Sequence, residues 1–482
     1  MSPVTRPAFK KSLNLVDSSA IVIGSMIGSG IFIVSADMSR TLGSPGWLLV
    51  AWLITGFMTI IAALSYGELA TMMPKAGGPY VYLREAYSPL IGFLYGWTLF
   101  LVIQTGTIAA VAMAFGKFMG VIIPWISETN TLLRLGPVKI SSVHVIAIGS
   151  LALLTWINSR GIKTGKHVQN TFTFTKVIIL ILLLLAGFFF AGSEGFKANS
   201  DYFWQAASLD KSTGLITPLS GGMLVAALGM AMVGSLFTCD AWSDITFASG
   251  EVVNPKRTLP ASLFWGTLIA FLLFFLSNIV YIKVLPLRGA PDGADVIERG
   301  MAFATNDRLG TAAISSIFGD YAAVIMAVLI VISTFGCNNG LILSGARVYY
   351  AMAADRLFFK NVGELNRRAV PGNGLWVQFI WASVLCLSGS YSQLLDYVVF
   401  AVLIFYALTI LAIFVLRFKR PDAERPYKAF GYPVLPAVYI LLATAIMIIL
   451  LIYKPTFTLR GLAIVLIGIP VYYIWNRFNK QA

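Results

Sequence analysis

The residues with the clearest capacity to bind a ligand are glycines and serines that interrupt an apolar stretch near the N-terminus. Segment 24–30 reads GSMIGSG, and three glycines within seven residues disfavour a continuous helix. One interpretation is close helix packing, because Gly24 and Gly28 form a GxxxG pair. The other is an unwound segment at Gly28, Ser29 and Gly30, whose free N–H groups meet an anionic ligand at the start of a second half-helix. The Gly-Ser-Gly triplet favours the second interpretation.

A second polar interruption lies in an apolar stretch at 237–244, which reads FTCDAWSD and ends at Asp244. A carboxylate in hydrocarbon costs at least ~2.5–3.5 kcal/mol, so Asp240 is a candidate functional residue. The alternative is that Asp240 caps the second half of a broken helix. The sequence leaves both alternatives open. Phe237 and Trp242 are expected to pack within the span.

A single lysine, Lys176, lies about eight residues inside another apolar stretch, or about 12 Å along a helix axis. One interpretation is that its side chain extends back to the membrane interface. The other is that its ammonium occupies a polar cavity as a fixed positive charge in place of a metal cation, where it could also exchange a proton.

The composition defines the elements that must position these residues. Of the 482 residues, 58% are hydrophobic and 12% are charged, whereas soluble domains have about 25% charged residues. The apolar stretches are continuous and do not alternate with period two, which disfavours an outer-membrane barrel. The sequence therefore predicts an all-α polytopic membrane protein embedded in a lipid bilayer. We expect twelve transmembrane helices, at 15–40, 46–73, 89–118, 141–160, 168–191, 219–249, 259–284, 318–353, 375–390, 396–417, 432–453 and 459–477.

The net charge of +14 is explained by basic loops on one side of the membrane. Most of the lysines and arginines fall in loops on the same side as the N-terminus, so both termini are expected in the cytoplasm and the protein in the inner or plasma membrane. No basic cluster is interleaved with aromatic residues, which argues against nucleic-acid binding. Cys239, Cys337 and Cys386 lie in apolar stretches without metal-ligand spacing, so we expect no metal and no cofactor.

The first and sixth predicted spans are both long and both interrupted by polar residues or glycine. Five spans separate their starting points, so the second unit would enter the membrane from the opposite side, as in a five-plus-five inverted repeat with broken helices 1 and 6. The expected organisation is a cytoplasmic segment at 1–14, a first repeat at 15–191, a second repeat at 219–417, and two further helices at 432–477.

Five motifs in this order resemble the amino acid–polyamine–organocation superfamily, in its L-type amino acid transporter-like branch. They are GSMIGSGIF at 24–32, YGELATMMPKAGGPYVYLREAYSP at 66–89, FTCDAWSDITFASGEVVNPKRTLP at 237–260, STFGCNNG followed by Arg347 at 333–347, and RPYKAFGYPVLP at 425–436. The resemblance covers roughly residues 10 to 420. It implies the LeuT-like fold and transport by alternating access.

The resemblance also implies roles for individual residues in substrate binding. The substrate carboxylate would lie against the backbone of Gly28, Ser29 and Gly30 and the Ser29 hydroxyl. The ammonium would be held by carbonyls near Met26, Phe237 and Asp240, with Phe237 as the outer gate and Trp242 directly after the unwound stretch. Lys176 stands where other sodium-independent members place a lysine instead of sodium, and Ser333 and Thr334 would line the same pocket.

The expected function is sodium-independent transport of L-amino acids, with neutral ones as the expected substrates and exchange as the expected mode. Proton-coupled symport and a non-transporting amino-acid sensor are the alternatives; an intramembrane enzyme is disfavoured because no catalytic cluster emerges. Two departures from the branch matter. Asp240 and Ala241 replace common glycines, which leaves the substrate class open. No cysteine lies between residues 118 and 141, so no disulfide-linked glycoprotein subunit is expected.

Overall fold

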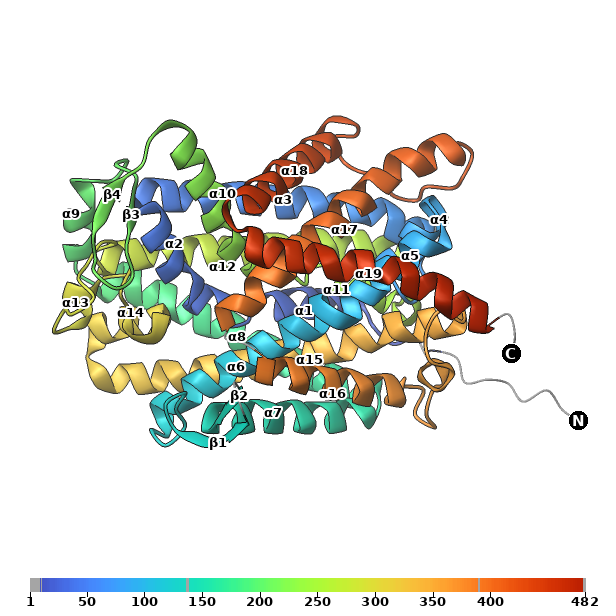
Figure 1. Ribbon diagram of the computed structural model, residues 1–482, viewed down its shortest axis with the longest axis horizontal. Helices are drawn as coiled ribbons and strands as arrows, with labels where there is room; N and C mark the ends of the chain where they lie inside the picture. Colours follow the sequence, from blue (N-terminus) through green and yellow to red (C-terminus); the bar gives the residue numbers. More distant parts are fainter. Residues whose placement is uncertain (1–8, 10, 136–137, 389–390, 480–482) are drawn as a thin grey trace, which may run out of the picture.

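The computed structural model describes residues 9, 11–135, 138–388 and 391–479. Long helices lie side by side along the longest axis of the molecule (Figure 1). The helices that form the predicted spans are α1 (Leu15–Met26), η1 (Gly30–Phe32), α2 (Val34–Leu42), α3 (Pro45–Met72), α5 (Pro89–Thr98), η2 (Leu99–Ile103), α6 (Gln104–Ile122), α7 (Ser142–Ser159), α8 (Ile162–Leu185), η3 (Ala186–Phe190), α10 (Gly221–Thr238), α11 (Asp244–Phe247), η4 (Ser249–Glu251), α12 (Pro255–Val284), α15 (Asp320–Ala354), α16 (Gly372–Ser388), α17 (Tyr391–Lys419), α18 (Val434–Tyr453) and α19 (Pro455–Asn479).

Within the described residues, 11 spans are long and apolar enough to cross a membrane. They match the predicted spans except the ninth, at 375–390. That segment forms α16, which has 17 residues, close to the minimum for a spanning helix, and residues 389–390 lie outside the described part of the chain. Most of the predicted segment 1–14 also lies outside it. The chain is thus a multi-pass membrane protein, and the repeat boundaries at 15–191 and 219–417 stay a prediction.

Short elements connect the long helices at both ends of the molecule. They are α4 (Pro79–Ala86), α9 (Glu194–Ser200), α13 (Val296–Arg299), α14 (Leu309–Phe318), η5 (Thr305–Asp307), η6 (Lys360–Gly363) and the antiparallel hairpins β1 (Thr131–Leu135) with β2 (Val138–Ser141) and β3 (Ala207–Leu209) with β4 (Ile216–Pro218). In Figure 1, α9, α13, β3 and β4 lie at one end and α4 at the other. The hairpins were not predicted, because strands of three to five residues leave too short a pattern in a loop.

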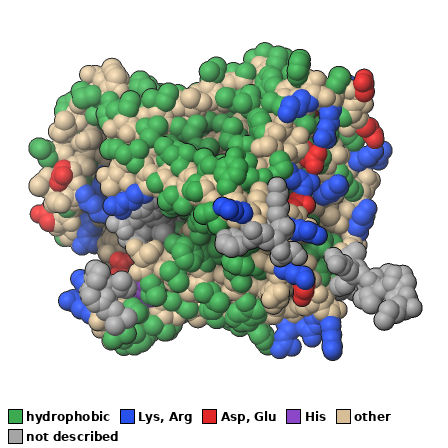
Figure 2. All heavy atoms as spheres, turned by 45° about the vertical axis from the view of Figure 1, so that its right-hand side comes forward, with side chains coloured by type: hydrophobic (Ala, Val, Ile, Leu, Met, Phe, Trp, Pro, Cys, Tyr) green, Lys and Arg blue, Asp and Glu red, His purple; other side chains and the backbone are tan. Residues whose placement is uncertain are grey.

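The outer surface shows how the fold meets the membrane. Figure 2 shows a broad belt of hydrophobic side chains, with charged side chains gathered mainly on the side that comes forward at the right. Large apolar side chains such as Phe189 (77% exposed) and Leu441 (70% exposed) point outward. In water these side chains would be unfavourable, but in a bilayer they contact lipid.

The broken first span lies at the centre of the bundle. Helix α1 starts with a capping box between Asn14 and Asp17 and packs against α8, α12 and α15. Helix α10 packs against α2, α3 and η1. The two interrupted spans are therefore in contact with each other and enclosed by the long helices.

An ion pair ties the end of the sixth span to α15 near the end that carries the N-terminal segment. Arg347 Nε donates to Glu251 Oε1 at 2.9 Å, and both side chains are 1% exposed. The Glu251 carbonyl accepts from the backbone of Ser12 and Leu13 at 2.8 and 3.0 Å. The N-terminal segment, the sixth span and α15 thus converge on one residue.

We expect Glu251→Gln to lower the free energy of unfolding by about 3–5 kcal/mol, because it leaves the Arg347 guanidinium buried without a counter-charge. Thermal unfolding of the purified protein in detergent measures this, and adding Arg347→Met should restore part of the loss. Lys256→Gln, in the exposed pair with Glu424 at 2.6 Å, is the control and should change stability by about 1 kcal/mol or less. Equal losses for both single variants would contradict the prediction.

Candidate functional site

The first helix break separates α1 from a short 3₁₀ turn. At the end of α1, Ile27 N donates to Ile23 O at 2.9 Å, and within the turn Phe32 N donates to Ser29 O at 3.0 Å. The first N–H groups of a new helical turn have no preceding carbonyl to bind. They carry partial positive charge and are suited to an anion. Ser29 lies at this point and is fully buried.

The glycines of segment 24–30 are consistent with both interpretations of the motif, close helix packing and an interrupted helix. A Cβ at Gly24 would lie 2.1 Å from Thr173 Oγ1, so this glycine permits α1 to pack closely on α8. A Cβ at Gly30 would lie 2.3 Å from Thr238 Oγ1, on the last residue of α10. The close-packing interpretation therefore holds at Gly24, and the break in the helix follows it. The contact at Gly30 places the two breaks directly against each other.

The second break follows Thr238. Cys239 N and Asp240 N still donate to carbonyls of the last turn of α10, and α11 starts only at Asp244. Between them Ala241 has φ +64°, a left-handed conformation that favours glycine. Glycine would fit this backbone without strain, whereas alanine adopts it at a cost.

The aromatic residues beside the second break lie on different sides of it. The Trp242 ring is 1% exposed and packs edge-on against Tyr66 at 4.7 Å and tilted against Tyr406 at 5.1 Å between ring centroids. The Trp242 side chain is thus packed against neighbouring aromatic rings, as expected for an aromatic residue in a span. Phe237 lies in the last turn of α10 and Met26 ends α1, both buried. The gating role of Phe237 and the binding roles of all three stay a prediction.

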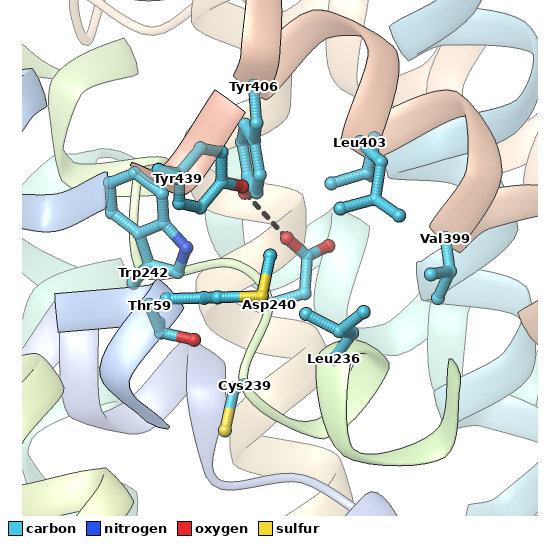
Figure 3. Close-up of a pocket in the computed structure, with 11 residues that line it drawn as sticks. Thr59, Leu236, Cys239, Asp240, Trp242, Val399, Leu403, Tyr406 and Tyr439 are labelled. Carbon is cyan, nitrogen blue, oxygen red and sulfur yellow. Dashed lines mark hydrogen bonds between the residues drawn. The ribbon is translucent and has the colours of Figure 1, made fainter. Parts of the chain in front are cut away.

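Asp240 binds a residue that sequence reasoning missed. Tyr406 in α17 donates its hydroxyl to Asp240 Oδ1 at 2.5 Å, and Figure 3 shows the two side chains pointing toward one another. Ser243 occupies the N-cap position of α11, three residues after Asp240, and both the functional and the capping interpretation of Asp240 stay predictions. A tyrosine within an apolar span has no sequence signal that could have identified it.

Asp244, noted in the sequence only as following Asp240, is also buried and hydrogen-bonded. Its Oδ2 accepts from Ser344 Oγ at 2.5 Å and from Gln104 Nε2 at 3.2 Å. Gln104 also donates to the Leu341 carbonyl at 2.8 Å. The start of α11 is thereby connected to α6 and α15 by neutral donors.

Lys176 lies inside the protein. Its side chain is 1% exposed and its Nζ donates to the Gly24 carbonyl at 2.5 Å. The interpretation that it extends back to the membrane interface is therefore wrong. The last carbonyls of a helix carry partial negative charge, which favours a cation at this position.

Side chains of α15 bind the same end of α1. Cys337 Sγ donates to the Ser25 carbonyl at 3.0 Å, and Ser333 Oγ lies 3.5 Å from the Ile27 carbonyl. Thr334 is fully buried but bonds within its own helix, to the Ile330 carbonyl at 3.0 Å. Lys176 and Ser333 both contact carbonyls at the end of α1; the role of Lys176, Ser333 and Thr334 as a cation site stays a prediction, and the contribution of Cys337 was missed.

A Cβ on Gly28 would lie 2.9 Å from Cys337 Sγ, so the second glycine of the GxxxG pair also permits close packing, against α15. No group of three or more His, Cys, Asp or Glu suited to a metal occurs among the described residues. The role of Lys176 as a fixed positive charge at the end of α1 stays a prediction.

Two facing broken helices within a bundle of apolar helices are an arrangement typical of membrane transporters. Residues 13–474 match the family model described as amino acid permease, so the chain belongs to that family. This confirms the resemblance to the amino acid–polyamine–organocation superfamily and its L-type branch.

Named relatives align with nearly the whole chain. The human b(0,+)-type amino acid transporter 1 is 27% identical over 98% of this chain and 89% of the relative. The human large neutral amino acids transporter small subunit 2 is 28% identical over 97% of this chain and 81% of the relative. The mouse Asc-type amino acid transporter 1 is 28% identical over 97% and 82%, respectively.

We expect Ala241→Gly to raise the free energy of unfolding by about 0.5–1 kcal/mol, because glycine removes the strain of the left-handed backbone. The midpoint of thermal unfolding in detergent reports the change. Ala445→Gly, in the exposed middle of α18, is the control and should destabilise by about 1 kcal/mol. Destabilisation of similar size in both variants would mean that Ala241 is not strained.

Proposed function

We propose that this amino acid permease is a sodium-independent secondary transporter that moves L-amino acids by alternating access, with exchange as its mode. The observation that carries the proposal is the contact between the two helix breaks, seen where Gly30 meets Thr238. The start of a helix carries partial positive charge and the end of a helix carries partial negative charge. A zwitterion has the complementary pair of charges, a carboxylate and an ammonium.

In this proposal the substrate carboxylate binds the backbone of Gly28, Ser29 and Gly30 and the Ser29 hydroxyl. The ammonium binds main-chain carbonyls near Met26, Phe237 and Asp240, and the Phe237 ring closes the site from outside. Trp242 supports the break through its contacts with Tyr66 and Tyr406. The relatives whose names specify neutral amino acids support neutral L-amino acids as substrates.

Sodium independence rests on Lys176. Its ammonium already bonds the Gly24 carbonyl, and Ser333 and Thr334 lie on the facing helix. A sodium ion at this place would compete with a fixed positive charge. Because an amine can also carry and release a proton, proton-coupled symport is the second candidate.

Both termini are proposed to lie in the cytoplasm, in keeping with the basic loops on that side. The ion pair between Glu251 and Arg347 would then close the cytoplasmic side of the sixth span. The chain is proposed to act without a disulfide-linked glycoprotein, since no cysteine occurs between residues 118 and 141 and Cys239, Cys337 and Cys386 are all buried.

Purified protein in liposomes tests the proposal through uptake of labelled L-alanine and L-leucine without sodium. Uptake that requires unlabelled amino acid inside supports exchange, whereas uptake driven by an acidic exterior alone identifies proton coupling. Binding without uptake would indicate a sensor.

Ser29→Ala should weaken binding about three- to tenfold by removing one hydrogen bond to a charged group, with thermal stability retained. Unchanged affinity in a folded Ser29→Ala protein would contradict the carboxylate assignment.

We expect Lys176→Ala to reduce the rate of uptake about tenfold or more, because it leaves the carbonyls at the end of α1 unpartnered and removes the fixed charge. The rate is measured in the same liposomes at several external pH values and with sodium added. Lys283→Ala is the matched control, since Lys283 Nζ also binds main-chain carbonyls, of Gly187 and Phe188, but at η3. Wild-type kinetics in Lys176→Ala would refute a role for Lys176 in transport.

A further inference from the structure

A cavity at the end of the molecule opposite α4 is lined by two basic side chains. It has a volume of about 230 Å³ and lies between the last turns of α6 and the segments 124–129 and 306–308, with Lys117 and Arg308 in its lining. Helix α14, which starts directly after Arg308, lies near α13 at this end in Figure 1. None of the residues proposed to bind the substrate lines this cavity.

The walls of the cavity are held by hydrogen bonds within the chain. Ser142 Oγ donates to the Trp125 carbonyl at 3.0 Å, and Ser127 N donates to Ser142 Oγ at 2.9 Å. A Cβ on Gly120 would lie 2.2 Å from the Ile126 carbonyl oxygen, so the segment after α6 packs closely on that helix. The cavity is therefore built into the fold.

Arg308 has no acidic partner in the cavity. It is half-buried, and among the described residues no acceptor hydrogen-bonds its guanidinium and no carboxylate forms an ion pair with it. The neighbouring carboxylate of Asp307 instead binds Arg40 at 2.7 Å and Lys211 at 3.4 Å. Burial lowers the pKa of Arg308 below its ordinary value, and the nearby Glu128 carboxylate opposes this only in part. The N–H donors of the guanidinium are thus free to bind a ligand.

The backbone before Arg308 is strained. Asn306 and Asp307 have φ values of +53° and +59°, two consecutive left-handed residues that are not glycine. Such a conformation persists only where surrounding contacts hold it, and it is found preferentially at functional sites. Here Arg40 holds Asp307 through its carboxylate, while the next residue, Arg308, lines the cavity.

Lys117 supplies the second positive charge. Its side chain is 18% exposed, and its Nζ lies 3.8 Å from Glu128 Oε1, which is too long for a hydrogen bond. With Arg308, the lining has two basic side chains and one carboxylate, so a single anionic group would balance it. A guanidinium matches the geometry of a phosphate group, and an ammonium beside it adds a point charge.

The surface next to the cavity is apolar and exposed. Ile123 is 44% exposed and Trp125 is 58% exposed, and they flank Pro124, which lines the cavity. Tryptophan is enriched where the membrane meets water, so the cavity opens at the level of lipid headgroups. A free ion would not use these apolar side chains, whereas a lipid would cover them when its phosphate enters the cavity.

We propose that this cavity binds the phosphate of an anionic phospholipid, held by Arg308 and Lys117. Phosphatidylglycerol balances the excess positive charge of the lining, whereas phosphatidylcholine brings a positive charge of its own. The bound lipid would join α6 to the segment 306–308. This inference goes beyond the proposed function and does not depend on what the chain transports.

Native mass spectrometry of the full-length protein in detergent tests the proposal, with phosphatidylglycerol or phosphatidylcholine of the same acyl chains added. The wild type should bind phosphatidylglycerol about tenfold more tightly than phosphatidylcholine. Arg308→Gln should weaken phosphatidylglycerol binding about tenfold, because it removes charge-assisted hydrogen bonds. Arg308→Lys keeps the charge without the planar fork and should lose about threefold. Lys139→Gln removes an exposed lysine of β2 and, as the control, should change binding less than about twofold.

Glu128→Gln provides a test of opposite sign. It removes the carboxylate that competes for Lys117 and should strengthen phosphatidylglycerol binding about threefold. A general loss of stability could not produce this gain, so the proposal stays testable even where Arg308→Gln fails to fold.

Three outcomes would overturn the proposal. The first is equal binding of the two lipids by the wild type, and the second is unchanged phosphatidylglycerol binding by a folded Arg308→Gln protein. The third is thermal stabilisation by inorganic phosphate alone, lost in Arg308→Gln, with no retention of phosphatidylglycerol. That result would show that the cavity takes a free anion instead of a lipid.

Discussion

The structure depends on one constraint: main-chain groups inside a bilayer must find partners within the protein. Each unpaired N–H or C=O in hydrocarbon costs several kcal/mol. A helix broken in mid-membrane is tolerated only where other groups complete it. At the end of α1 the completing groups are Lys176 and Cys337, which bind the Gly24 and Ser25 carbonyls. The start of η1 lies against the other break, where Gly30 meets Thr238, and in the proposed function the substrate carboxylate binds there.

Several polar residues that look unrelated in the sequence compensate for these breaks. Tyr406 binds Asp240, and Ser344 and Gln104 bind Asp244, each from a different helix. These contacts fix the position of α11, a helix of only four residues that would not be stable alone. The second break is thus held open by hydrogen bonds from α6, α15 and α17. In the proposed transporter, a substrate site built in this way would be preorganised and coupled to the helices that move.

The sequence predicted the breaks because glycine and buried charge are strong local signals. Gly28, Ser29 and Gly30 cannot extend a stable helix, and Lys176 is conspicuous in an apolar stretch. Tyr406, Gln104 and Ser344 could not be found, since each is a single polar residue whose partner lies at least 100 positions away in the chain. These residues meet their partners only because their helices are neighbours in the fold. The sequence of an apolar span carries no pattern that specifies which helices will be its neighbours.

The basic and the acidic side chains within the membrane-spanning part have different kinds of hydrogen-bond partner. Lys176 donates to the Gly24 carbonyl, where the partial negative charge at the end of α1 favours a cation. Asp240 and Asp244 receive only neutral hydrogen bonds, which lower the cost of burial without cancelling the charge. Within the described residues, a basic side chain thus lies at the end of α1, whereas the side-chain donors to the two carboxylates of the sixth span are neutral. In the proposed function the ammonium of an amino acid would supply the positive charge that the sixth span lacks.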